Sequence, residues 1–135
     1  MNTTLQLRRA GNKILAPDQV PVRPYELGQC NNMALAVGCV EPGVRYGVHT
    51  HRRIEQITFV VSGMVDVFSF DIDVAEIRKI RLGAGEAVVT MPGETLEFRC
   101  ASANMAKVLF ITSPPYPEDN SDAVVLRSHS EVMSD

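Results

Sequence analysis

The sequence has no excess of positive charge and no long apolar run, and these two absences exclude several kinds of partner. Its 135 residues carry 13 Lys and Arg against 16 Asp and Glu, a formal net charge of −3. Nucleic acids and anionic membranes attract basic patches, so we expect neither as a partner. No stretch approaches the roughly 20 apolar residues of a transmembrane helix. The first residues place their charges after a short apolar element, which is not the pattern of a signal peptide.

Cysteine is scarce and follows no metal-binding spacing. Cys30, Cys39 and Cys100 are odd in number, so we expect reduced thiols in a cytoplasmic protein. The sequence also lacks a glycine-rich phosphate loop or another cofactor motif, and we expect no organic cofactor.

Helical periodicity is absent beyond about one turn, and short strands between glycine and proline turns take its place. The expected strands cover residues 33–40, 44–51, 54–61, 64–71, 76–82, 86–91, 95–101 and 105–112. Strands of this length at short spacing predict an all-β, antiparallel sandwich or barrel.

We expect a single domain over residues 1–135, with its core at about 30–112 and an N-terminal arm at 1–29. Consecutive prolines from Pro114 end the sheet, because proline cannot donate to a β-ladder. The rest of the segment 113–135 is polar, and we expect a loosely attached tail or a short helix there.

Histidine is also scarce, and two of the three histidines stand one residue apart. His49 and His51 occupy positions i and i+2, so in a strand their side chains project to the same face. Two adjacent imidazoles make the first half of a metal site or an acid–base pair. The third, His129, lies in the polar tail and is interpreted as a solvated side chain.

The alternation of the next strand decides which side chain joins the histidines. Arg52 and Arg53 separate two apolar runs, which predicts a turn or bulge that resets the alternation. We count alternate positions of the expected strand 54–61 back from the turn at residue 63. One face then carries Gln56, Thr58 and Val60, and the other carries Ile57, Phe59 and Val61. The mixed set suits a pocket, so we expect Gln56 beside the histidines and Glu55 outside. If Glu55 points inward instead, a two-His-one-Glu metal site becomes the better interpretation.

The segment from Gly43 to Gly63 resembles the first motif of the cupin superfamily. That motif is Gly, five residues, His-x-His, three or four residues, Glu or Gln, six residues and Gly, and Gln56 takes the acid position here. The resemblance covers residues of about 30–112. It implies a small, single-domain jelly-roll β-barrel, in agreement with the strand pattern.

The segment from Gly85 resembles the second cupin motif with departures. Met91 takes the place of a proline, Leu96 that of a histidine and Cys100 that of an asparagine. Leucine cannot coordinate a metal. The ligand set that the resemblance implies is therefore incomplete.

A full cupin site resembles three histidines and one Glu or Gln around a divalent metal, such as Zn, Fe, Mn or Ni. His49, His51 and Gln56 would be the ligands here, with Glu55 as the alternative to Gln56. Because an amide is neutral and Leu96 replaces the fourth ligand, we expect weaker binding than in a four-ligand cupin.

Two cupin subgroups are similar to the run from Arg45 to Gln56. One is the sugar-nucleotide 3,4-ketoisomerases, which use the imidazoles as acid and base without a metal; the other is the metal-binding monocupins with Gln in this position. Tyr46 replaces an arginine of the first subgroup and is a candidate hydrogen-bond donor in catalysis. Arg45 and Arg53 are candidates for binding an anionic substrate, and their alternative is a solvated charge at the rim.

Three functions follow for a small-molecule substrate. The first is an enzyme that moves a proton on a keto or sugar-like metabolite, as an isomerase, epimerase, dehydratase or cyclase. The second is a non-haem metal dioxygenase, against which Leu96 counts. The third is a non-catalytic binding or regulatory module, against which the intact His-x-His with Gln counts. Thr58, Val60 and Leu96 are expected to line the substrate cavity. The outward set Ile57, Phe59 and Val61 and the strand at 33–40 are too apolar for a solvated exterior, which predicts a homodimer.

Overall fold

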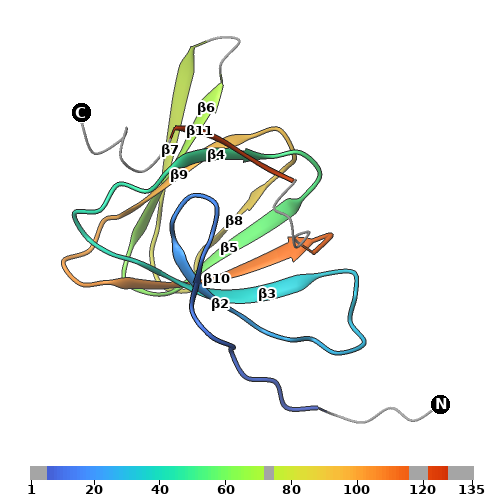
Figure 1. The fold of residues 1–135 in the computed structure, drawn as a ribbon. Coiled ribbons are helices and arrows are strands. Elements are labelled where there is room, and N and C mark those ends of the chain that lie inside the picture. Colours follow the sequence, from blue (N-terminus) through green and yellow to red (C-terminus); the bar gives the residue numbers. More distant parts are fainter. Residues whose placement is uncertain (1–5, 72–74, 116–121, 128–135) are drawn as a thin grey trace.

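The computed structural model describes residues 6–71, 75–115 and 122–127, and the regular structure in these ranges consists of β-strands (Figure 1). The strands are β1 (Ile14–Leu15), β2 (Pro21–Pro24), β3 (Ala34–Val40), β4 (Val48–His51), β5 (Glu55–Ser62), β6 (Val65–Asp71), β7 (Glu76–Leu82), β8 (Ala87–Thr90), β9 (Thr95–Cys100), β10 (Ala106–Ser113) and β11 (Ala123–Arg127). No helix that could cross a membrane occurs in the described part of the chain.

Two antiparallel sheets form the fold. One has six strands in the order β1-β2-β3-β10-β5-β8, and the other has five in the order β11-β4-β9-β6-β7. Strands that are distant in sequence lie side by side: β10 lies between β3 and β5 in the six-stranded sheet. Two antiparallel sheets connected in this way form a jelly roll. The prediction of an all-β, antiparallel jelly roll is therefore confirmed.

The hydrophobic core lies between the inner faces of the two sheets. Its fully buried side chains include Val40, Val60 and Val108 from one sheet and Val65, Leu96 and Phe98 from the other. The rings of Phe98 and Phe110 meet across the sheets, with 5.7 Å between their centroids. Burial of each such side chain stabilises the fold by roughly 1.5–3 kcal/mol.

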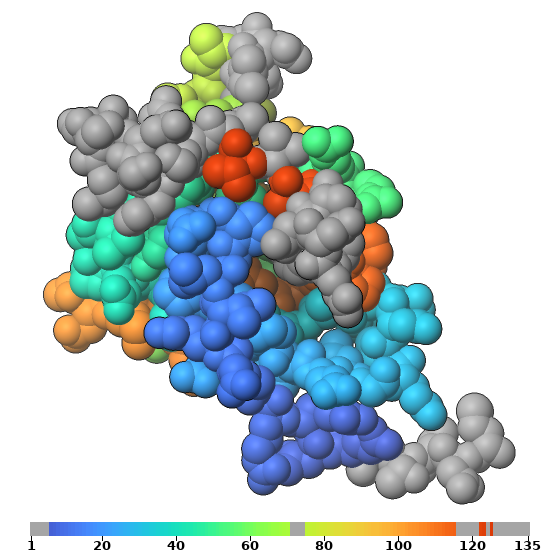
Figure 2. All heavy atoms as spheres, in the orientation of Figure 1, coloured from blue at the N-terminus to red at the C-terminus, as the bar shows by residue number. Residues whose placement is uncertain are grey.

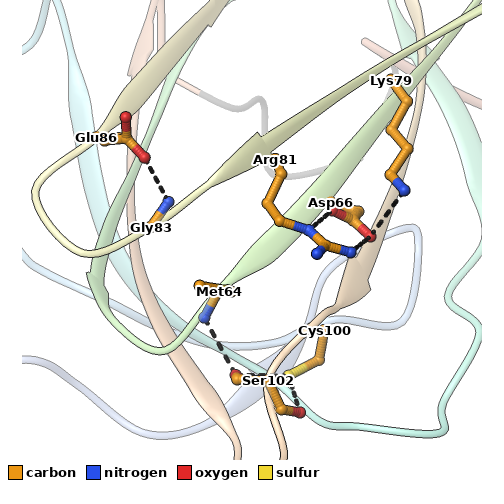
Figure 3. A network of polar contacts seen from close by, with 8 residues as sticks. All are labelled: Met64, Asp66, Lys79, Arg81, Gly83, Glu86, Cys100 and Ser102. Carbon is orange, nitrogen blue, oxygen red and sulfur yellow. Dashed lines mark hydrogen bonds and ion pairs between the residues drawn. The ribbon is translucent and has the colours of Figure 1, made fainter.

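An ion-pair cluster fastens the hairpin of β6 and β7 on the outer face (Figure 3). Arg81 lies directly opposite Asp66 and donates two hydrogen bonds to its carboxylate, at 2.8 and 3.1 Å. Lys79 adds an ion pair at 3.6 Å. The hydrogen bonds from Arg81 hold the pKa of Asp66 below its usual value. At the turn after β7, the backbone N–H of Gly83 donates to the carboxylate of Glu86 at 2.7 Å.

Segments on both sides of the predicted core belong to the sheets. From the expected N-terminal arm, β2 pairs with β3, and from the expected tail, β11 pairs with β4. The prediction of a loosely attached tail or short helix was wrong for residues 123–127, because this short apolar run completes the sheet beside the histidine strand. His129 lies outside the described residues. The expected strand at 44–51 begins only at Val48.

Candidate functional site

A cavity of about 240 Å³ opens between the two sheets, where β4 and β5 face the N-terminal hairpin of β1 and β2. Its polar lining residues are Asp18, Tyr25, His49, His51, Gln56 and Thr112. The other lining residues are Ala, Val, Leu, Ile, Pro or Phe. Figure 2 shows the N-terminal segment, in blue, and the segment after residue 121, in red, on the same face of the molecule.

The two histidines of β4 both point to the cavity. Each is 4% exposed, and their rings meet edge to face, with 5.0 Å between centroids and 82° between planes. Because β4 is flanked by β9 and β11, its backbone is hydrogen-bonded on both sides, which fixes the positions of the rings. The prediction that both imidazoles share one face is confirmed.

Gln56 lines the cavity and Glu55 lies outside. Gln56 is 2% exposed, whereas Glu55 is exposed to solvent, so the alternation argument is confirmed and the inward-Glu55 alternative is wrong. The amide of Gln56 donates to the hydroxyl of Thr58 at 3.1 Å. Thr112 lies directly opposite Gln56 on β10, and its buried hydroxyl has no hydrogen-bond partner in the described residues.

A buried aspartate from the C-terminal segment holds His51. Asp122 is 1% exposed, and its Oδ2 lies 3.1 Å from Nδ1 of His51. Its Oδ1 accepts a hydrogen bond of 2.7 Å from the backbone N–H of Arg53, and its backbone carbonyl accepts one from Arg52. An aspartate held by several bonds in this way orients the imidazole and favours the tautomer with its proton on Nδ1.

A second buried aspartate lies beside His49. Asp18 is 4% exposed, and its Oδ2 lies 3.5 Å from Nδ1 of His49, an ion-pair distance when the ring is protonated. Its Oδ1 accepts from the backbone N–H of Val20 at 3.2 Å, and its backbone carbonyl accepts from Gly47 at 2.8 Å. The turn that carries Asp18 is therefore fastened to the loop before β4.

Opposing effects act on the protonation of His51. Burial, followed by the neighbouring His49, lowers the pKa of His51, while Asp122 acts in the opposite direction. Removal of an imidazolium from water is costly, and a second positive charge 5.0 Å away adds repulsion. The net result is a pKa below the ordinary value of about 6.5, so His51 is neutral at neutral pH.

The structure places the other predicted site residues away from the cavity lining. Tyr46 packs in the hydrophobic core, and its hydroxyl accepts a hydrogen bond from the backbone N–H of Glu41 at 2.9 Å. Burial raises the pKa of Tyr46, so its hydroxyl stays protonated. Tyr46 thus serves the core and not the candidate site.

The two arginines predicted to bind an anionic substrate pair with carboxylates elsewhere. Arg45 lies 3.6 Å from Glu97, which alternates with the inward Phe98 and so faces the outer side of its sheet. The side chain of Arg53 is 68% exposed and lies 3.7 Å from Asp122. Neither arginine lines the cavity.

Three apolar or small residues predicted to line the cavity lie deeper in the fold. Thr58 and Val60 are fully buried and absent from the lining. Leu96 is 1% exposed and lies directly opposite His49 in the register of β4 and β9, so both side chains project to the same face. The alignment that puts Leu96 in the place of a cupin histidine is consistent with this register, although Leu96 itself does not border the cavity.

The residues present fit a divalent metal only partly. His49, His51 and Gln56 supply two imidazoles and one neutral amide. Asp122 beside Nδ1 of His51 matches the usual hydrogen-bonded support of a metal-bound histidine, whereas Asp18 lies 3.5 Å from Nδ1 of His49 without a hydrogen bond. Within the described ranges, however, no three His, Cys, Asp or Glu side chains gather as a metal-binding group. A metal here would have two imidazole nitrogens and one amide oxygen as its protein ligands.

No protein family profile matches this sequence. No curated protein sequence matches it either. Many solved structures are similar in fold.

Oxalate decarboxylase from Bacillus subtilis superposes with a TM-score of 0.75 at 16% identity, over 93% of this chain and 33% of the other. The capsular polysaccharide assembling protein CapF from Staphylococcus aureus gives 0.73 at 15% identity, over 86% of this chain and 34% of the other. This chain thus spans about a third of the length of each of these proteins.

A third structure is nearer in size. It is an uncharacterised conserved protein with a double-stranded β-helix domain from Klebsiella pneumoniae subsp. pneumoniae, with a TM-score of 0.62 at 14% identity, over 82% of this chain and 86% of the other. At such identities the likeness concerns the fold alone. The strand order, the inward histidine pair of β4 and these neighbours together show that this chain has the cupin fold.

Proposed function

We propose that the cavity is an active site that moves a proton at a carbon atom next to a carbonyl group, as an isomerase or epimerase does. The observation that carries this proposal is the buried pair of His51, which lines the cavity, and Asp122, which holds His51 from outside the lining. An imidazole oriented by a carboxylate is the usual form of a general base in enzymes.

His51 is the base in this proposal. Its lowered pKa keeps it neutral at neutral pH, and the hydrogen bond at Nδ1 leaves the lone pair on Nε2. Nε2 takes the proton from the carbon atom, the electron pair of the C–H bond becomes a C=C bond, and the carbonyl oxygen gains the negative charge. Return of the proton to the other face, or to the neighbouring carbon, completes the reaction.

His49 is the second proton carrier. With 5.0 Å between the two ring centroids, repulsion disfavours a positive charge on both rings at once. Asp18 lies 3.5 Å from Nδ1 of His49 and would form an ion pair with that ring whenever it carries a proton. Two imidazoles side by side suit transfer of a proton to and from one substrate.

Gln56 and Thr112 are suited to donate hydrogen bonds to the carbonyl oxygen of the substrate. They lie opposite each other on β5 and β10, both are at most 2% exposed, and both line the cavity. Buried donors that are fixed in place stabilise charge that develops on an oxygen atom, because they need no reorganisation during the reaction.

As an alternative, we propose that the site binds a divalent metal weakly through His49, His51 and Gln56, in which case His51 would be a ligand and not the base. A bound metal would act as a Lewis acid on the carbonyl oxygen. One protein of similar fold supports metal binding in general, without indicating which metal this chain would bind. It is Bacillus subtilis oxalate decarboxylase, one structure of which was determined to study its Mn(II) centres.

Exchange of protons against deuterium tests the proposed reaction without knowledge of the substrate. Small ketones and hydroxyketones are incubated with the protein in D₂O, and the loss of the signal next to the carbonyl is followed by proton NMR. We expect exchange catalysed by the native protein, and a decrease of at least about 100-fold in His51→Gln. Parallel samples with EDTA or with added Zn²⁺ or Mn²⁺ show whether exchange depends on the imidazole pair alone or on a bound metal. Absence of exchange across the panel in every sample would argue against proton transfer.

We propose further that the chain forms a homodimer through the outer face of the six-stranded sheet. Two rows of apolar residues cross four adjacent strands: Leu35, Ile111, Ile57 and Val89 in one row, and Val37, Leu109, Phe59 and Ala87 in the next. Val89 is 59% exposed and Ile57 37% exposed in the monomer. A continuous apolar face of this kind is typical of an interface between subunits.

A further inference from the structure

We infer that the ligand of the cavity is a small, uncharged molecule with an apolar body and a single oxygen-bearing end, and not a sugar, a sugar nucleotide or a carboxylate. The inference rests on the proposed function only in placing the ligand in the same cavity. It follows from three properties of the described lining: its apolar extent, its charges and the position of its hydrogen-bonding groups.

Most lining residues are apolar, and several of them belong to the hydrophobic core. Phe98 and Phe110 lie with 5.7 Å between their ring centroids, and Val20 and Val22 from the N-terminal hairpin face the same space. All four are at most 9% exposed. A sugar would leave most of its hydroxyl groups against these surfaces without hydrogen bonds, at a cost of roughly 1–3 kcal/mol for each buried hydroxyl.

The charges in the lining disfavour an anion. Among the described residues that border the cavity there is no Lys or Arg, and Asp18 contributes a buried carboxylate. Arg45 and Arg53 pair with Glu97 and Asp122 outside it. A carboxylate or phosphate in the cavity would therefore lose its hydration without gaining a bidentate cation partner.

Two hydrogen-bonding residues of the lining lie directly opposite each other. The hydroxyl of Thr112 is buried, lines the cavity and lacks a hydrogen-bond partner in the part of the chain that the structure describes. Gln56 on β5 lies directly opposite Thr112 on β10, and the two histidines also line the cavity. A buried hydroxyl without a partner is costly in a folded protein, and a carbonyl or hydroxyl oxygen of a ligand would satisfy it.

The volume indicates how much of a ligand the cavity can enclose. Pockets for drug-sized ligands measure about 300–1,000 Å³, and this cavity is smaller, at about 240 Å³. A nucleoside diphosphate sugar would extend far outside it. A ring or branched chain of modest size with one carbonyl group matches both the volume and the lining.

A matched pair of probes tests this inference. Cyclohexyl methyl ketone and cyclohexanecarboxylate have the same number of non-hydrogen atoms and nearly the same shape, but the second is an anion. Binding to the protein is measured by NMR titration at neutral pH, with methyl glucoside as the sugar probe. We expect the ketone to bind at least about tenfold more tightly than either other probe, a difference of about 1.4 kcal/mol.

Two threonine variants locate the oxygen of the probe. Thr112→Val should weaken the binding of the ketone about three- to tenfold, the usual value of one hydrogen bond. Thr50→Val is the control, because Thr50 lies between the two histidines on the opposite face of β4 and its hydroxyl is likewise buried without a partner in the described residues. Circular dichroism and thermal unfolding show whether each variant is folded.

The outcomes separate this inference from the proposed reaction. Equal or tighter binding of the carboxylate or the glucoside would overturn the inference, as would a ketone affinity that Thr112→Val leaves unchanged in a folded variant. If the ketone binds as expected but exchanges no proton, the proposed reaction fails and the ligand class stands. If exchange occurs only on anionic substrates, the reaction stands and the ligand class fails.

Discussion

Nδ1 of His51 lies 3.1 Å from Oδ2 of Asp122, although 71 residues separate them in the sequence. The aspartate precedes β11, and the pairing of β11 with β4 brings it beside the histidine strand. Its other carboxylate oxygen is occupied by the backbone of Arg53. The orientation of His51 therefore depends on a strand from the far end of the described chain.

Replacement of Asp122 by Asn should lower the rate of proton exchange by about 100-fold, with little change in the binding of the ketone probe. The amide cannot favour the same tautomer as the carboxylate does. Because Asp122 opposes the lowering of the His51 pKa, its removal should also shift the acidic limb of the pH–rate profile to lower pH. Asp66→Asn, on the outer face, is the control. An unchanged pH profile in a folded Asp122→Asn protein would contradict the assigned role.

The free energy of unfolding should decrease as the pH falls from about 7 to about 5.5. Burial lowers the pKa of His51 in the folded state, so near pH 6.5 the unfolded chain binds more protons than the folded one. Stability is therefore complete above the unfolded pKa and is lost as the pH falls toward the folded pKa. The lowered pKa of Asp66 acts only near pH 4 and below, and so lies outside this window.

Urea unfolding of EDTA-treated protein at pH 7.5 and 5.5 measures this effect. In His51→Asn the difference in unfolding free energy between the two pH values should be smaller than in the native protein. A difference of the same size in both would show that other groups carry the pH dependence.

Replacement of Leu96 by His should raise the affinity for Zn²⁺ or Ni²⁺ by about one to two orders of magnitude. Leu96 faces the same side as His49 from the neighbouring strand, so an imidazole there adds a ligand to the existing three. His51→Ala should abolish binding. Isothermal titration of the apo protein measures each affinity, and equal affinities in the native and Leu96→His proteins would mean that position 96 is not the place of the fourth ligand.

Sedimentation velocity at micromolar concentration should show a dimer, at twice the chain mass of 14.8 kDa. Phe59→Glu places a charge in the centre of the apolar face and should convert the protein to a monomer. Ile80→Glu is the control, because Ile80 is 48% exposed on β7 of the other sheet. A native protein that sediments only as a 14.8 kDa species would rule out the dimer.

The sequence predicted those features that depend on local alternation. Side chains two apart in a strand share a face, so the shared direction of His49 and His51, and the inward position of Gln56, followed from counting. Asp18 and Asp122 were missed, because a single aspartate carries no local signal of the partner that a distant strand or turn brings to it. The β-branched pair Val124-Val125 was the one available sign that the tail forms a strand.

Two arginines were assigned to the site although they do not line the cavity. Their place next to the histidine motif suggested substrate contacts, but Arg45 and Arg53 precede and follow β4 and turn toward carboxylates outside the cavity. Which carboxylate an arginine meets depends on the pairing of whole strands. Proximity in sequence to a functional motif was therefore a poor guide to proximity in space.

The two aspartates also set the order in which the site can form during synthesis. Asp18 leaves the ribosome before β4, whereas Asp122 follows ten of the eleven strands. The carboxylate beside His49 is thus made before β4, whereas His51 acquires its carboxylate only when the segment before β11 has been made. A chain that ends after β10 would therefore lack the carboxylate that orients its base.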